Sequence, residues 1–204
     1  MRQQSVNRWL MLIGKGNKMQ KILPEKPLCG IDEAGRGPLA GSLVVAGVVL
    51  LRSVEGLMDS KKLTERRREA LYVSILQHSR HHIVSFSAKE IDRFGISFCM
   101  TQGLKEIIRE LGDYTYLFDG NSKFGVEGIH TMVKADSKVA EVSAASILAK
   151  VTHDREMLEF SKQYPQYGFE KHKGYGTKAH IEALEKYGRC EHHRKSFRAK
   201  CLDG

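Results

Sequence analysis

The sequence predicts a single α/β domain. Short apolar runs rich in Val, Ile and aromatic residues alternate with longer amphipathic runs of helical period, the pattern of strands and helices that share one sheet. Acidic residues follow three of the predicted strands, and in α/β sheets functional sites gather at the carboxyl ends of the strands. A chain of 204 residues can bury a substantial core, and no internal repeat indicates a second domain.

The first predicted strand pair contains the most informative stretch of the chain. Leu28–Ile31 is predicted to be the end of a buried strand, Gly35–Gly41 a tight loop, and Ser42–Leu51 a second strand. Asp32 and Glu33 therefore lie where a core strand ends. A carboxylate beside a core must be paired, hydrogen-bonded or bound to a cation, because burying it alone is too costly.

Three interpretations of this stretch remain open from the residues alone. The first is that an acid pair is a solvated strand end. The second is a phosphate loop at Gly35, Gly37 and Gly41, but a dinucleotide fingerprint must lead into a helix, whereas Pro38 and the β-branched run after Gly41 predict a strand. The third is a metal-binding acid pair followed by a loop, Gly35-Arg36-Gly37, whose amides and guanidinium can approach a polyanion.

Strands and helices alternate along the rest of the chain. The predicted elements are a polar turn at 58–62, a helix at 64–78 capped by Thr64, a strand at 83–86, helices at 89–93 and 96–111, strands at 114–118 and 129–135, and helices at 139–162 and 178–187. Asp119 and Asp136 follow the two late strands, as Asp32 follows the first. Small residues on helix 139–162 are expected to pack against the sheet. Asp154 can project toward the site or into solvent, and solvent is expected.

Composition favours an anionic partner in a reducing compartment. The chain has 33 Lys and Arg against 24 Asp and Glu, a net charge of +9, which is typical of proteins that bind nucleic acid. Four cysteines without paired spacing predict a cytoplasmic protein, and Cys190, His192 and His193 lack the partner pair of a zinc finger. No apolar run is long enough to cross a membrane. Residues 1–26 are predicted to be a flexible basic arm, with Met19 an alternative start, before a domain at 27–204.

The last part of the chain, 163–204, is predicted to form a substrate-binding loop, a helix and a basic tail. Its segment Tyr164–Lys178 alternates aromatic residues with bases and glycines, a composition that suits a sugar-phosphate backbone. Three of its aromatic side chains are expected to pack inward, namely Tyr164, Tyr167 and Phe169. Tyr175 lies between two glycines and is expected to be presented to a ligand.

Several of these motifs together resemble ribonuclease HII, the prokaryotic type 2 ribonuclease H. The matching segments are IDEAGRGPLAG at 31–41, DSKKL at 59–63, FDG at 118–120, KADSK at 134–138, AASILAKVTHDR at 144–155, YPQYGFEKHKGYGTKAH at 164–180 and HRKSF at 193–197. They span Cys29 to Phe197 in the family's order. Ser42 departs from the family, whose members commonly have proline there. The related ribonuclease HIII carries an N-terminal substrate-binding domain where this chain has only a short arm.

The resemblance implies a ribonuclease H-like fold, a mixed central sheet flanked by helices with a C-terminal helical extension. It also implies roles for individual residues. The four carboxylates that bind the catalytic metal ions would be Asp32, Glu33, Asp119 and Asp136. The residues that bind substrate would be Gly35, Arg36 and Gly37, which read the ribonucleotide 2′-hydroxyl, Tyr175, which works with that loop, and Lys61, which approaches the substrate backbone.

The implied activity is a metal-dependent endonuclease that cuts the RNA strand of RNA-DNA hybrids and cuts 5′ of single ribonucleotides in duplex DNA. Oxygen-only ligands favour Mg²⁺ or Mn²⁺ over zinc. The expected products carry 3′-hydroxyl and 5′-phosphate ends, and the expected roles are ribonucleotide excision repair and removal of RNA primers in DNA replication. A monomer is expected, and a DNA clamp remains open as a partner. Two alternatives remain: a hybrid-binding protein without hydrolysis, and another nuclease or strand-transferase of the same fold.

Overall fold

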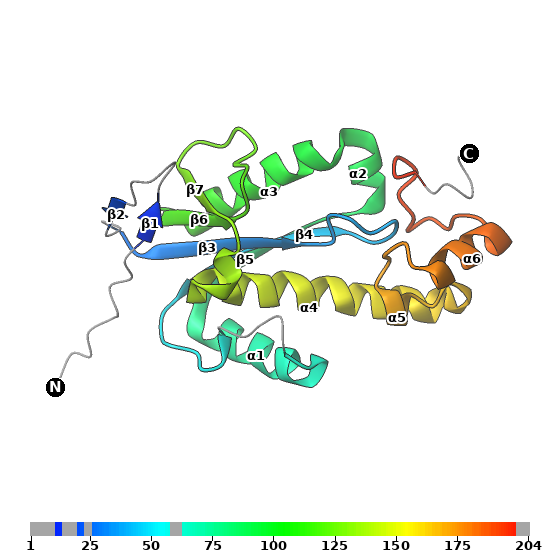
Figure 1. The fold of residues 1–204 in the computed structure, drawn as a ribbon, viewed down its shortest axis with the longest axis horizontal. Coiled ribbons are helices and arrows are strands. Elements are labelled where there is room, and N and C mark those ends of the chain that lie inside the picture. The colour runs from blue at the N-terminus through cyan, green and yellow to red at the C-terminus, as the bar shows by residue number, and fades with distance from the viewer. Residues whose placement is uncertain (1–10, 14–19, 23–25, 58–62, 199–204) are drawn as a thin grey trace.

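The computed structural model describes residues 11–13, 20–22, 26–57 and 63–198, and its core is one mixed sheet (Figure 1). The sheet has five strands in the order β5-β4-β3-β6-β7. β3 pairs antiparallel with β4, and β4 with β5, while β3-β6 and β6-β7 are parallel. The strands are β3 (Leu28–Ala34), β4 (Leu43–Leu50), β5 (Ser79–Phe86), β6 (Thr115–Asp119) and β7 (Ile129–Met132).

Helices cover both faces of this sheet. Figure 1 shows α2 and α3 on one side of the strands and α1 and α4 on the other. The long helices are α1 (Glu65–His78), α3 (Ile96–Leu111), α4 (Ala140–Gln163) and α6 (Lys178–Tyr187), and the short ones are α2 (Ala88–Phe94) and α5 (Phe169–His172). This arrangement confirms the predicted fold class.

Strand β4 shows why the sheet sequence is apolar without interruption. Successive side chains of a strand point to opposite faces. Val45 and Val49 pack with the side chains of α3, whereas Val44, Ala46 and Val48 pack with those of α1 and α4. Because a helix layer covers each face of β4, apolar and polar residues do not alternate along it, and residues 43–49 are all buried.

Small residues bring α4 against the sheet, as the sequence predicted. A Cβ atom built on Gly30 of β3 would lie 2.2 Å from the Glu141 carbonyl carbon and the Val142 nitrogen. Only glycine allows this approach. Ala144, Ala145 and their small neighbours on α4 are also fully buried. The close contact fixes α4 directly behind the strand that carries Asp32.

The structure corrects several predicted boundaries. Helices 96–111 and 178–187 are confirmed residue for residue. The strand predicted at 129–135 ends at Met132, because Lys134 adopts a left-handed backbone conformation and a 3₁₀ helix, η2 (Ala135–Ser137), follows. The arm predicted without regular structure contains two paired strands, β1 (Met11–Ile13) and β2 (Gln20–Ile22). The turn predicted at 58–62 lies outside the described residues.

The C-terminal elements form a separate layer at one end of α4, where Figure 1 shows α5 and α6 beyond the sheet. A 3₁₀ helix, η3 (Pro165–Tyr167), precedes α5. Tyr167 and Phe169 are buried, as predicted, and pack with Ala40 of the loop after β3 and Met157 of α4. Tyr164 is only half-buried. None of the helices in the described ranges combines the length and apolar character that a bilayer crossing requires.

Candidate active site

The sheet places Asp32 and Asp119 at the same level. The parallel pairing of β3 with β6 ends at Ile31 and Phe118, so the next residue on each strand is an aspartate. β3 itself continues to Ala34 and includes Asp32 and Glu33, three residues beyond the predicted end. Asp32 is buried, and its Oδ1 accepts a hydrogen bond of 2.8 Å from the Glu33 amide.

Burial and mutual repulsion make this acid group electrostatically unfavourable. Burial, then the charges of Glu33 and Asp119, raise the pKa of Asp32 well above its usual range. Burial also raises the pKa of Glu33, and the charge of Asp119 adds to this, although Arg36 at 3.2 Å opposes it. The structure thus brings three of the four predicted carboxylates into electrostatic contact.

The fourth carboxylate, Asp136, has a different support from the one predicted. It lies on η2, not at the end of a strand, and is 1% exposed. The preceding residue, Ala135, donates its amide hydrogen to Asp119 Oδ1 at 3.1 Å. This bond joins the turn that carries Asp136 to the acid group on β3 and β6.

The donor set fits a hard divalent cation. Glu33 Oε2 is buried without a hydrogen-bond partner among the described residues, and a buried lone acceptor of this kind is costly unless a cation or donor satisfies it. All four predicted ligands are carboxylates, the type preferred by Mg²⁺ and Mn²⁺. Within the described ranges, no three His, Cys, Asp or Glu side chains are already grouped closely enough to hold one ion.

A constrained loop follows the acids. Gly35 has a φ of +80°, and a Cβ atom there would lie 2.2 Å from the Ser42 carbonyl oxygen and 2.6 Å from His153 Cδ2. The loop therefore requires glycine at this position. Arg36 and Gly37 are exposed at its tip.

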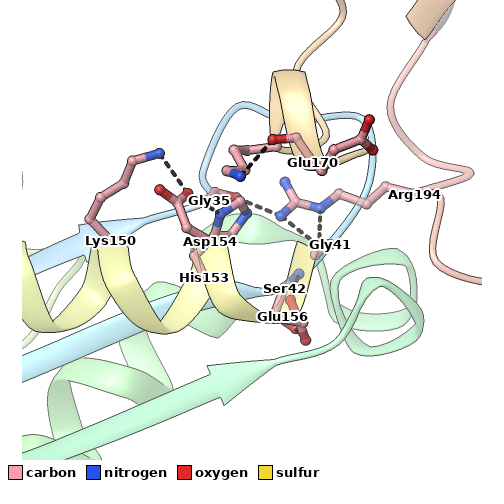
Figure 2. A network of polar contacts seen from close by, with 10 residues as sticks. Gly35, Gly41, Ser42, Lys150, His153, Asp154, Glu156, Glu170 and Arg194 are labelled. Carbon is pink, nitrogen blue, oxygen red and sulfur yellow. Dashed lines mark hydrogen bonds and ion pairs between the residues drawn. The ribbon is translucent and has the colours of Figure 1, made fainter. Parts of the chain in front are cut away.

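Buried Arg194 holds this loop, as Figure 2 shows. Its guanidinium donates to the carbonyl oxygens of Gly35, Arg36 and Gly41, with Nε 3.0 Å from Gly41 O. The side chain is 0% exposed, and burial lowers the pKa of Arg194 to about 10, which leaves it charged at neutral pH. The sequence suggested only a basic tail here, so the position of Arg194 was missed. Its one available signal was the HRKSF motif.

Tyr175 faces the same loop from the C-terminal layer. It is 46% exposed, as predicted for a presented ring, and a Cβ atom on Gly37 would lie 3.9 Å from Tyr175 Cε1. Tyr175 and Glu33 both line a pocket of about 290 Å³. The other lining residues are Ala34, Arg68, Ser146, Ile147 and Lys150, so two cationic side chains missed by the sequence interpretation line the same pocket as Glu33.

Asp154 is buried, whereas the sequence predicted that it points to solvent. It is 8% exposed and accepts from Lys150 Nζ at 2.7 Å, and His153 Nδ1 lies 3.6 Å away (Figure 2). Burial acts to raise its pKa, but the nearby His153 ring and the hydrogen bond from Lys150 lower the pKa of Asp154 below its usual value. Asp154 thus orients a lysine of the pocket. Lys61, the remaining predicted site residue, lies outside the described residues.

Comparisons with known proteins agree with this architecture. A family model described as Ribonuclease HII matches residues 29–200. A ribonuclease HII from Sulfurovum sp. is 70% identical over 87% of this chain and 95% of the relative, and one from Aliarcobacter butzleri is 56% identical over 87% and 93%.

Solved structures give the same result. The ribonuclease HII of the Archaeoglobus fulgidus complex with PCNA has a TM-score of 0.73 and 30% identity, covering 82% of this chain and 92% of that one. The Pyrococcus horikoshii ribonuclease H2 has a TM-score of 0.70 and 28% identity, covering 86% and 96%. A more distant fold relative, Bst ribonuclease HIII in complex with Mn²⁺, has a TM-score of 0.68 and 20% identity, covering 86% and 68%. The chain belongs to the ribonuclease HII family, metal-dependent endoribonucleases that cut the RNA strand of RNA-DNA hybrids.

Proposed function

We propose that this protein cleaves the phosphodiester bond 5′ of a ribonucleotide, both in RNA-DNA hybrids and at single ribonucleotides embedded in duplex DNA. The observation that carries the proposal is the shared pocket of Glu33 and Tyr175, which combines an acid group with a ring presented beside the Gly35–Gly37 loop. A nuclease needs the first feature, and selection for a ribonucleotide needs the second.

Asp32, Glu33, Asp119 and Asp136 would hold the metal ions in this proposal. Two bound Mg²⁺ or Mn²⁺ ions would activate the attacking water and stabilise the leaving 3′-oxygen, which yields 3′-hydroxyl and 5′-phosphate ends. The protein's part is to keep the carboxylates together despite their repulsion. The register of β3 and β6, which places Asp32 beside Asp119, and the hydrogen bond from the Ala135 amide to Asp119 Oδ1 support that arrangement.

Selection for RNA would come from the loop and the ring. The 2′-hydroxyl alone distinguishes one ribonucleotide within DNA, and a site built to hydrogen-bond it rejects a sugar that lacks it. We assign this hydrogen bonding to the backbone of Gly35, Arg36 and Gly37, which Arg194 holds in place. The ring of Tyr175 would pack on the neighbouring sugar, and Lys61 would approach the backbone.

Arg68 and Lys150 would add favourable charge for the phosphates of the bound strand, since each neutralised phosphate strengthens nucleic-acid binding. The protein would act as a monomer in the cytoplasm, in ribonucleotide excision repair and primer removal. The complex of the Archaeoglobus relative with PCNA supports a sliding clamp as the partner to test first.

The deciding experiment uses a DNA duplex with one ribonucleotide, incubated with Mg²⁺ or Mn²⁺, beside an all-DNA duplex. Cleavage 5′ of the ribonucleotide by the wild type, its loss in Asp119→Asn and an intact control duplex are the expected results. Tight binding without cleavage under either metal would refute the nuclease and favour a hybrid-binding protein. Tyr175→Phe and Tyr175→Ala separate hydroxyl from ring, and unchanged cleavage in both would remove Tyr175 from the site.

A further inference from the structure

A chain of polar contacts runs from the tail after α6 to the main chain of Tyr175. His180 on α6 and His193 in the tail are both buried, at 0% and 2% exposure, and their Nε2 atoms lie 3.0 Å apart. His180 Nδ1 lies 2.9 Å from the Tyr175 carbonyl oxygen. At the other end, His193 Nδ1 lies 2.9 Å from the Cys190 amide nitrogen and 3.1 Å from its sulfur.

The chemistry at the two ends of this chain determines every hydrogen in it. A carbonyl oxygen can only accept, so His180 must carry its hydrogen on Nδ1. An amide nitrogen can only donate, so His193 Nδ1 must be the acceptor, and the neutral ring carries its hydrogen on Nε2. One hydrogen then lies between the two Nε2 atoms, donated by His193 and accepted by His180. The contacts are mutually consistent only if both rings are neutral.

The surroundings favour this neutral state. Burial lowers the pKa of His180 and of His193 to about 4, and for His193 the neighbouring imidazole adds to the effect. A second hydrogen on His180 would face the hydrogen of His193, and one on His193 would face the Cys190 amide. The chain therefore has a fixed direction, from the Cys190 amide to the Tyr175 carbonyl.

We propose that His180 and His193 are positioning residues, which hold Tyr175 against the Gly35–Gly37 loop through this directional hydrogen-bond chain. The inference rests on the proposed function, because it assigns the pair an effect through Tyr175. The residue before Tyr175, Gly174, packs closely on the continuation of that loop. Leu39 N donates to Gly174 O at 2.8 Å, and a Cβ atom on Gly174 would lie 2.3 Å from Ala40 O.

Two substitutions of His180 test this inference with matched loss of the ring. In His180→Asn the side-chain amide takes the position of Nδ1 and can still donate to Tyr175 O, whereas in His180→Gln the amide takes the position of Nε2 and keeps only the contact with His193. In His180→Gln, loss of the hydrogen bond to Tyr175 is expected to lower kcat for a duplex with one ribonucleotide about tenfold, with KM little changed. His180→Asn is expected to retain most of the wild-type kcat. Equal kcat in the two variants would overturn the inference.

A readout without activity separates the inference from the proposed function. In the metal-free wild-type protein, nitrogen-15 NMR of the imidazoles is expected to show the Nδ1–H tautomer for His180 and the Nε2–H tautomer for His193. The reverse assignment, or a mixture of tautomers at either ring, would overturn the hydrogen-bond chain. Absence of cleavage by the wild type would refute the proposed function, and the tautomers seen by NMR would still confirm or refute the hydrogen-bond chain.

Discussion

The buried imidazole pair makes stability depend on pH below neutrality. Burial lowers the pKa of His180 and His193 to about 4, from 6.5 for an exposed imidazole. The unfolded chain therefore binds more protons than the folded chain between these two values. The stabilising contribution of the neutral pair is complete above pH 6.5 and is lost as the pH falls toward 4.

The two pKa values give the size of this effect. For one imidazole with these values, linkage predicts that the free energy of unfolding falls by about 2 kcal/mol between pH 7 and pH 5. In the unfolded chain both rings bind protons independently, whereas in the folded chain the charge of one ring further disfavours protonation of the other, so the pair together loses about 4 kcal/mol. A loss of this size is a large part of the stability of an ordinary domain.

Urea unfolding at pH 7 and pH 5, in EDTA, measures the effect. His180→Asn removes one titrating ring, so its loss of stability between the two pH values is expected to be smaller than that of the wild type by about 2 kcal/mol. Asp32 and Glu33 act in the opposite sense, because their raised pKa values favour the folded state at low pH, but they act equally in both proteins. His130→Asn, at an exposed position, is the control and should retain the wild-type loss. If His180→Asn lost as much stability between pH 7 and pH 5 as the wild type, His180 would not be a source of the pH dependence.

Three further predictions concern the acids and the loop. Asp32→Asn should raise the stability of the metal-free protein at pH 7 by about 1 kcal/mol, because a buried carboxylate with a raised pKa disfavours folding at that pH. The same variant should lose both cleavage and the shift of Tm by Mn²⁺. A drop in the Tm of the metal-free protein would contradict this reasoning. Gly35→Ala should cost about 3 kcal/mol and most activity. The control Gly168→Ala, in the left-handed region at a φ of +68° with open space around it, should cost about 1 kcal/mol; equal urea midpoints for both variants would argue against the close contact at Gly35. Arg194→Met should lower the free energy of unfolding by about 3 kcal/mol, because it leaves the Gly35 and Gly41 carbonyls unpaired. The control Lys195→Met, at an exposed position, should lower it by less than about 0.5 kcal/mol in the same urea unfolding experiment. A small effect at Arg194 would show that the loop does not depend on it.

The elements that the sequence predicted well are those with a strong local pattern. Helix 96–111 has a continuous apolar stripe and a glycine at each end, and the structure reproduces both boundaries. The apolar run of β4 was equally clear, because a strand covered on both faces has no polar alternation. Asp136 was found by a partly wrong route. The pattern of an acid after a strand selected the residue, but the left-handed Lys134 had already ended the strand.

The features that the sequence did not predict depend on contacts between distant segments. Asp154 lies on a long helix with charged neighbours, and nothing in its local sequence separates a buried acid from a solvated one. Its burial follows from the packing of α4 between the sheet and the C-terminal layer. Arg194 belongs to a run of bases that resembles a solvated tail, although its partners lie about 150 residues earlier in the chain. Periodicity carries no information about such partners.

The position of Arg194 in the chain also has a consequence for synthesis on the ribosome. The acids of β3 and the loop that follows them emerge early, but the guanidinium that satisfies the loop carbonyls is among the last described residues to be made. Until that segment leaves the exit tunnel, the Gly35 and Gly41 carbonyls must remain in water and the loop cannot close on its support. The sheet can therefore form before this loop reaches its final conformation, because the loop must wait for the Arg194 segment to leave the tunnel.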